Sequence, residues 1–310
     1  MRVFLKKVIC FSLLLALVLG ILLGVLFVIV APVYSRSFNA ALIDKAERLL
    51  SINEPKIVLI GNSNVAFGFD SALLEAAFQM PVVNMGLHGG LGNAFAEQAA
   101  LLNPQPGDIY IVCHTEYEDT DTILDPSLAW ITIENHTELW RMIRAKDWPL
   151  MIKSIPSYLR HIIRKVLLQD ESDAVPPYAR ASFNEYGDVD DLRSKSLVSI
   201  SNLLPPDIGD TTTNRLNELD VALAEHGAKL LVAAYPIAYA NNRPHVDAFD
   251  AFEDQLQSEL NCPVISNFTD YFFHSSLLYD TAYHLTTEGA KQRTRLLIDD
   301  LLQWNPSLLH

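Results

Sequence analysis

The chain of 310 residues contains only three cysteines. Cys10 lies in an apolar leader, so Cys113 and Cys262 alone remain for the globular part, and no CxxC pair or His-Cys ligand spacing occurs. This excludes a disulfide framework and a cysteine-bound structural zinc. A single disulfide between Cys113 and Cys262 is one alternative. We expect two buried free thiols instead, because cysteine is among the residue types most often buried.

Positive charge is also scarce, with 23 Lys and Arg against 37 Asp and Glu and a net charge of -14. Nucleic-acid surfaces depend on clustered Lys and Arg that release counterions from phosphates, so we expect no nucleic-acid partner. No GxGxxG motif follows the first predicted strand, and His88, His114 and His274 stand singly, without metal-ligand spacing. We therefore expect no cofactor and no metal.

The leader has no charged residue over 8–31, which is long enough to cross a hydrocarbon core of about 30 Å as a helix. Three basic residues precede it: Arg2, Lys6 and Lys7. Because positive charge stays on the cytoplasmic side, we predict a single-pass signal anchor over 1–32 in the cell membrane, with the rest extracytoplasmic. A cleaved signal peptide is the alternative. It usually has an apolar core of about 7–15 residues and a small-x-small site, and this leader matches neither.

After an expected helical stalk over 33–54, short apolar runs alternate with helical patterns. The run over 56–60 ends at Gly61 and is typical of a strand buried on both faces of a parallel sheet. Further runs lie at 82–83, 108–113, 229–235 and 263–265, and helical patterns at 94–102, 213–226, 245–260 and 288–304. This alternation predicts an α/β fold over 55–310, a three-layer α/β/α sandwich with a mostly parallel sheet.

A region with little strand character, about 119–206, is expected to be a helical insertion. Within its first half, the stretch 141–165 carries seven basic residues against one acid, Asp147, and Trp140, Trp148 and Tyr158 lie beside or among them. Such a basic, Trp-bearing amphipathic helix can lie against anionic lipid or a membrane partner. The alternative is an ordinary helical cover over the active site.

Three short blocks carry the residues that nucleophilic catalysis needs. Ser63 follows the first predicted strand, at the strand end where open α/β sheets bind ligands. Gly89 lies in a glycine-rich turn after the second predicted strand, and glycine lets the backbone pass close to its neighbours. Asp280 and His284 precede the last predicted helix, and a carboxylate and an imidazole are the other two groups that a serine triad uses.

These blocks resemble the SGNH (GDSL-like) hydrolase superfamily. Gly61-Asn62-Ser63-Asn64 is similar to its first block, commonly Gly-Asp-Ser, with Asn62 in place of the aspartate. Asn84-Met85-Gly86, followed by Gly89, is similar to the second block, and Asp280-x-x-x-His284 is one residue longer than the family's closing Asp-x-x-His. The resemblance implies Ser63 as nucleophile, His284 as base, Asp280 as its partner, and the N–H groups of Ser63 and Gly89 as the oxyanion hole. The candidate pocket residues are Asn62, Asn64, Gly86, His88 and Glu116.

The third family block is not matched. Where the family has Gly-x-Asn-Asp, this chain has Cys113-His114-Thr115-Glu116, so the oxyanion asparagine is missing and Glu116 is nearest to its position. The chain in this respect resembles a divergent branch, the extracytoplasmic proteins that accompany membrane-bound O-acyltransferases in polysaccharide or teichoic acid modification.

The resemblance implies a serine esterase or O-acyltransferase that moves acyl groups, with acetyl as the expected one, on a cell-envelope or secreted polysaccharide or another hydroxyl acceptor. A membrane-bound O-acyltransferase is the expected protein partner. The first alternative is a catalytically inactive carbohydrate-binding or scaffold protein with the same fold, because fold alone does not prove function. A lipid esterase is a third possibility, suggested by membrane attachment alone.

Overall fold

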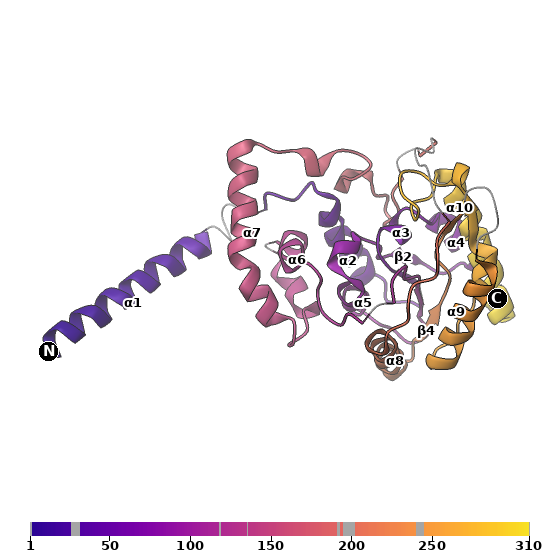
Figure 1. Ribbon diagram of the computed structural model, residues 1–310, viewed down its shortest axis with the longest axis horizontal. Coiled ribbons are helices and arrows are strands. Elements are labelled where there is room, and N and C mark those ends of the chain that lie inside the picture. The colour runs from indigo at the N-terminus through magenta and orange to yellow at the C-terminus, as the bar shows by residue number, and fades with distance from the viewer. Residues whose placement is uncertain are drawn as a thin grey trace.

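A computed structural model describes residues 2–25, 32–117, 119–134, 136–190, 193–194, 202–239 and 245–309. Helix α1 (Arg2–Val25) projects away from the rest of the chain (Figure 1). Its segment Phe4–Val25, of 22 residues, is long and apolar enough to cross a membrane, and none of it is buried against the rest of the protein. The predicted apolar helix is therefore confirmed, although residues 26–31 of the predicted run lie outside the described residues.

The main sheet has four parallel strands in the order β2-β1-β3-β4. They are β1 (Ile57–Ile60), β2 (Val82–Asn84), β3 (Ile109–Val112) and β4 (Lys229–Val232). All four were predicted. The fifth predicted run forms only an isolated parallel bridge, from Val264 to Val232 at the β4 edge. A separate parallel pair, β5 (Ile237–Tyr239) and β6 (Phe272–His274), was not predicted because three-residue strands carry little pattern.

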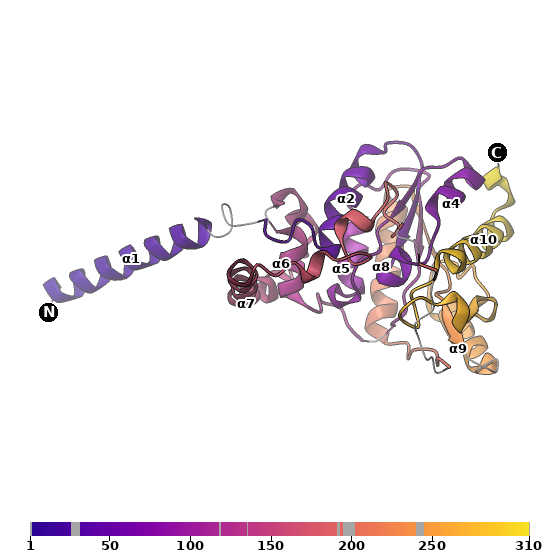
Figure 2. The same cartoon turned by 90° about the horizontal axis from the view of Figure 1, so that it is seen from above.

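Helices lie on both faces of the sheet (Figure 2). Alternate β1 residues face opposite sides: Val58 and Ile60 join one core cluster, Ile57 and Leu59 the other. The first cluster holds α2 (Ala41–Ser51), α5 (Asn93–Ala100), α8 (Asp210–Glu225) and α9 (Val246–Glu259); the second holds α4 (Ser71–Phe78) and α10 (Thr287–Trp304). The prediction of an α/β fold with a mostly parallel sheet is confirmed.

The predicted stalk over 33–54 is wrong, because this segment is part of the folded domain. One face of α2 is fully buried in the first core cluster, through Ala41, Leu42 and Leu49. The short helix η2 (Phe38–Ala40) before it is buried as well. The apolar periodicity assigned to a stalk is the core-facing stripe of α2, and an isolated helix of its 11 residues would be marginal in water.

The described part of the insertion holds helices and isolated β-bridges. Its elements are α6 (Pro126–Ile133), η4 (Thr137–Met142), α7 (Trp148–Leu168), η5 (Ser172–Ala174) and η6 (Arg180–Ser182). Trp140, Trp148 and Tyr158 pack around Trp130, with ring centroids 5.6, 6.2 and 6.1 Å from it. These aromatic rings therefore hold α6 and α7 together and do not form an outer aromatic face with the basic residues.

Cys113 and Cys262 are buried free thiols, as predicted. Burial raises the pKa of Cys113 to about 11 and that of Cys262 to about 12. Because the thiolate is the reactive form, neither cysteine is a nucleophile near neutral pH.

Candidate active site

Ser63 lies at the carboxyl end of β1, in the first position of the one-turn helix α3 (Ser63–Ala66). The turn before it is tight: a Cβ at Gly61 would meet Val65 Cγ2 at 2.5 Å and the carbonyl oxygen of Cys113 at 3.0 Å. Asn62 caps α3 by accepting a hydrogen bond from Asn64 N at 2.9 Å. This turn presents the Ser63 side chain at the edge of the sheet.

The structure brings Ser63, His284 and Asp280 together from two distant parts of the chain. Nε2 of His284 is 2.8 Å from Oγ of Ser63, and Nδ1 of His284 is 2.8 Å from Oδ1 of Asp280. The loop that carries them is held by Thr281 Oγ1, which accepts from His284 N at 3.0 Å, and by Thr286, which caps α10. The three predicted residues thus form one hydrogen-bonded chain.

The carboxylate of Asp280 is held in its ionised form. Burial raises its pKa, but hydrogen bonds from His284 and Tyr178 outweigh burial, so the pKa lies below its ordinary value. An ionised Asp280 beside Nδ1 favours the tautomer in which Nδ1 carries the proton. Nε2 is then free to accept the Ser63 proton.

Two aromatic residues that sequence reasoning missed hold His284 in place. The Tyr178 hydroxyl donates to Oδ2 of Asp280 and lies 3.2 Å from Nδ1 of His284. The ring of Phe67 stacks on the imidazole, with centroids 4.2 Å apart and planes 9° from parallel. Tyr178 comes from the insertion, more than 100 positions before its partners, and no sequence signal marks it.

Ser63 and His284 open into a cavity of about 430 Å³. Four other predicted residues line it: Asn62, His88, Gly89 and Glu116. Its walls also include Phe38, Thr115, Tyr178 and Tyr283, which were not predicted. The cavity combines aromatic surface with a few polar groups, the composition that small-molecule sites usually have.

Asn64 and Gly86 do not line this cavity, so their prediction as pocket residues is wrong. The Asn64 amide is fully buried and donates to Asn62 Oδ1 at 2.8 Å and to the carbonyl oxygen of Cys113 at 3.0 Å. A Cβ at Gly86 would meet Ala66 N at 2.4 Å. Asn64 orients Asn62, and Gly86 allows the segment after β2 to pass close to α3.

Backbone and side-chain donors are available around Ser63. In the described part of the chain, neither Ser63 N nor Gly89 N donates to a protein acceptor. Asn62 Nδ2 donates to Thr115 Oγ1 at 2.7 Å, so the Thr115 oxygen acts as acceptor and its own proton can be donated elsewhere. The side chain next to Asn62 is therefore Thr115 rather than Glu116, which is exposed at the cavity rim.

His88 contributes a neutral imidazole to the cavity wall. Its Nδ1 accepts from Gly90 N at 2.9 Å, so Nε2 carries the ring proton. Burial and the nearby His284 lower the pKa of His88, while Asp125 opposes them. At neutral pH His88 is thus a hydrogen-bond donor in the cavity.

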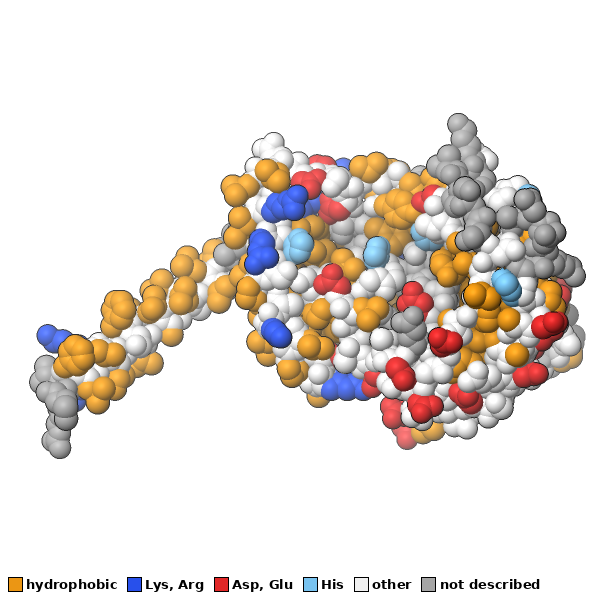
Figure 3. Space-filling view, in the orientation of Figure 1, with side chains coloured by type: hydrophobic (Ala, Val, Ile, Leu, Met, Phe, Trp, Pro, Cys, Tyr) orange, Lys and Arg blue, Asp and Glu red, His pale blue; other side chains and the backbone are white. Residues whose placement is uncertain are grey.

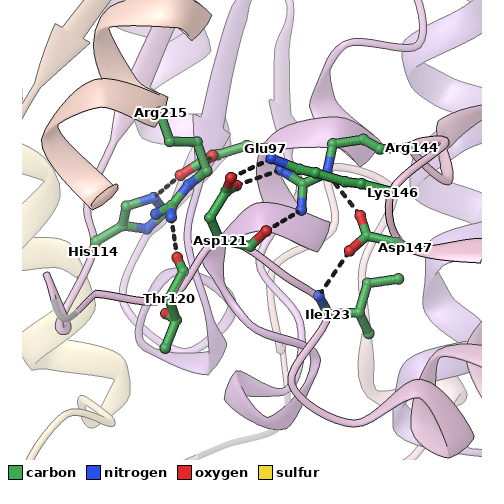
Figure 4. A network of polar contacts seen from close by, with 9 residues as sticks. All are labelled: Glu97, His114, Thr120, Asp121, Ile123, Arg144, Lys146, Asp147 and Arg215. Carbon is green, nitrogen blue, oxygen red and sulfur yellow. Dashed lines mark hydrogen bonds and ion pairs between the residues drawn. The ribbon is translucent and has the colours of Figure 1, made fainter. Parts of the chain in front are cut away.

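A buried polar network fixes the loop after β3 that carries Thr115 (Figure 4). Oε1 of Glu97 is 2.8 Å from His114 Nε2, and its Oε2 accepts from Arg215 Nε at 2.7 Å. Arg215 also donates to the carbonyl oxygen of Thr120. Burial raises the pKa of Glu97, but its bonds to His114 and Arg215 outweigh burial and keep that pKa below the ordinary value. His114 is therefore part of the scaffold and does not line the cavity.

Within the described ranges, no group of three or more His, Cys, Asp and Glu side chains is arranged to hold a metal ion. The side chains hydrogen-bonded in series at Ser63 are a hydroxyl, an imidazole and a carboxylate. Comparisons of this chain with protein-family models, curated proteins and solved structures found no match.

Proposed function

We propose that this chain is a serine esterase or O-acyltransferase with an SGNH-type three-layer sandwich, anchored to the membrane by α1. The observation that carries the proposal is the hydrogen-bonded chain from Ser63 through His284 to Asp280 at the end of a central parallel strand. A serine hydroxyl is a weak nucleophile until a neighbouring base takes its proton. This arrangement supplies that base and the carboxylate that orients it.

In the proposed reaction, Ser63 Oγ attacks the carbonyl carbon of an ester while His284 Nε2 takes the hydroxyl proton. Asp280 stabilises the imidazolium that forms, and the Tyr178 hydroxyl positions both groups. His284 then gives the proton to the leaving alcohol oxygen as the acyl-serine forms. Water or a second hydroxyl then attacks the acyl carbon while His284 takes its proton. The bond from the acyl carbon to Ser63 Oγ breaks, His284 returns the proton to Ser63 Oγ, and the acid or the new ester is released.

The proposed oxyanion donors are the N–H groups of Ser63 and Gly89 and the hydroxyl of Thr115, and their residues all line the cavity. A carboxylate at position 62 would accept the Thr115 proton. The amide of Asn62 instead donates to Thr115 and leaves that proton for the substrate. The pair Asn62 and Thr115 thereby takes the role of the oxyanion asparagine, which the family's third block contains and this chain lacks.

The proposed acceptor is a hydroxyl of a cell-envelope or secreted polysaccharide, and the acyl group is acetyl. The cavity of about 430 Å³ supports a small acyl group beside part of a sugar, because it joins the rings of Phe38 and Tyr283 with polar groups. The uncharged stretch of α1 from Val8 to Val25, which follows Arg2, Lys6 and Lys7 in the same helix, supports an extracytoplasmic domain. A membrane-bound O-acyltransferase would deliver the acyl group in the transfer reaction.

The test uses the full chain in detergent with p-nitrophenyl acetate, comparing wild type with Ser63→Ala by nitrophenol release and intact mass. We expect wild type to turn over or to gain one acetyl group. The variant should lose at least about a thousandfold in kcat and gain no acetyl group. Equal rates for the two proteins would refute Ser63 as nucleophile. No reaction in either, with or without the membrane partner, would favour the non-catalytic scaffold, and preference for a long-chain ester would favour a lipid esterase.

A further inference from the structure

Helix α7 carries exposed apolar side chains on its outer side. Its inner side is fully buried through Met151, Tyr158 and Ile162. On the outer side, Ile152, Ile163 and Leu167 are 59%, 48% and 76% exposed. Their spacing of eleven and four residues places them on one stripe of the helix. Apolar side chains exposed to water do not stabilise a folded domain. This stripe therefore indicates that an apolar surface covers it.

A basic stripe runs beside the apolar one. Lys153, Arg160 and Arg164 are spaced by seven and four residues, and all three are exposed. None of them forms an ion pair within the described part of the chain, and α7 contains no acidic residue. Figure 3 shows Lys and Arg gathered over the end of the domain next to α1, whereas Asp and Glu are concentrated toward the other end. The helix is thus a cationic surface on a protein whose net charge is -14.

The position of α7 is tied to the place where the chain leaves α1 (Figure 1). After α1, the chain is fixed at Val33, whose N–H donates to Glu134 Oε1 at 2.9 Å, and at Tyr34, whose ring lies 4.8 Å from Lys165 Nζ on α7. The eight residues from Val25 to Val33 can span at most about 28 Å. Wherever α1 crosses a bilayer, the end of α7 that carries Lys165 therefore lies close to the surface from which the chain emerges.

We propose that the outer side of α7 binds the anionic headgroup region of the membrane that holds α1. Ile152, Ile163 and Leu167 enter the boundary between headgroups and acyl chains. Lys153, Arg160 and Arg164 pair with lipid phosphates. The proposal rests on α1 as anchor but not on catalysis. With α1 in the bilayer and α7 on its surface, the domain is attached at two points and has one orientation on the membrane.

The experiment places a polarity-sensitive fluorophore at Ile163→Cys in the full chain, in a Cys10→Ala background; Cys113 and Cys262 are buried. The protein is reconstituted in nanodiscs of phosphatidylcholine alone or of an equal mixture with phosphatidylglycerol. We expect blue-shifted emission and strong quenching by lipid-borne quenchers in the anionic discs. The same fluorophore at Val221→Cys, an exposed site on α8, should show neither effect.

The charge test is the double variant Arg160→Glu and Arg164→Glu, which should reduce lipid quenching of the probe by about tenfold in anionic discs. Its matched control reverses two charges on α10, at Lys291 and Arg295, and should leave quenching unchanged. Co-elution with the discs reports α1 insertion separately. Quenching that is insensitive to lipid charge and to the α7 reversal would overturn the proposal. A signal seen only in native membranes would also overturn it and assign α7 to a protein partner.

Discussion

The side-chain amide of Asn62 donates to the hydroxyl of Thr115, with 2.7 Å between Nδ2 and Oγ1. If this hydroxyl is the third oxyanion donor, Thr115→Val should lower kcat by about a hundredfold with little change in KM, because the interaction is strongest in the transition state. Thr115→Ser keeps the hydroxyl and should stay within about threefold of wild type. Steady-state ester hydrolysis measures both. Equal activity of the valine variant would remove Thr115 from the oxyanion hole.

The substitution Asn62→Asp changes the other residue of this hydrogen bond. The new carboxylate can still accept from Asn64 N, but it would also accept the Thr115 proton and direct that hydroxyl away from the substrate. We expect kcat to fall by about tenfold or more, with an unchanged melting temperature. Asn261→Asp, a change at an exposed position, is the control. A fully active Asn62→Asp enzyme would contradict the proposed orientation of Thr115.

Tyr178 is a positioning residue in this mechanism. Tyr178→Phe removes the hydroxyl that contacts Asp280 and His284 but keeps the ring packed against Phe67. We expect about a tenfold lower kcat, an unchanged KM and no more than a small loss of stability. Tyr279→Phe makes the same chemical change on a ring that also contacts Phe67 and should have no effect. Loss of stability without loss of kcat would show that the Tyr178 hydroxyl is only structural.

The Glu97 network predicts a large stability effect away from Ser63. Arg215→Met would leave the buried Glu97 carboxylate with His114 alone. Removing one partner of a buried ion pair costs about 3 kcal/mol or more of unfolding free energy. Arg295→Met, at an exposed pair with Glu288, should cost less than about 0.5 kcal/mol. Denaturant unfolding of the two variants checks the difference, and similar midpoints would be inconsistent with the network.

Glu134 predicts a pH dependence of stability. Burial raises its pKa from 4.5 to about 7, although the N–H groups of Tyr34 and Val33 oppose this. Because the folded-state pKa is the higher one, its stabilising contribution is complete below pH 4.5 and is lost as the pH rises through about 7. Glu134→Gln should therefore flatten the fall in melting temperature over this range, while Glu171→Gln, at an exposed ion pair, should not. Parallel profiles for wild type and Glu134→Gln would contradict the assignment.

The sequence predicted the central strands because each is a local signal. Val58 and Leu59 belong to a short apolar run that must be buried on both faces, whatever surrounds it. Ser63, Asp280 and His284 could be predicted as a set because the blocks that carry them resemble those of the SGNH superfamily and because their side chains are the three that a serine triad needs. The catalytic roles of these residues remain predictions, and the experiments above test them.

Other features depend on contacts that no local pattern encodes. Tyr178 contacts Asp280, which lies more than 100 positions later in the sequence. The length of the segment between two residues does not predict whether they meet in the fold. The stalk was mispredicted because the periodicity of α2 shows that one face is apolar but not what covers it. Asn64 and Gly86 lie beside Asn62 and Ser63 in the fold. The way α3 packs decides which of these residues face the cavity and which lie behind it, and the sequence pattern does not encode that packing.

Phe38 is a wall of the cavity and lies thirteen positions after Val25, where α1 ends. Thirteen residues reach at most about 46 Å. Under the proposed anchoring, the reaction is therefore confined to a layer over the bilayer that is no deeper than this reach. A long polymer would be modified only along the stretch passing through that layer, so the spacing of acyl groups would reflect how the polymer is threaded past the membrane.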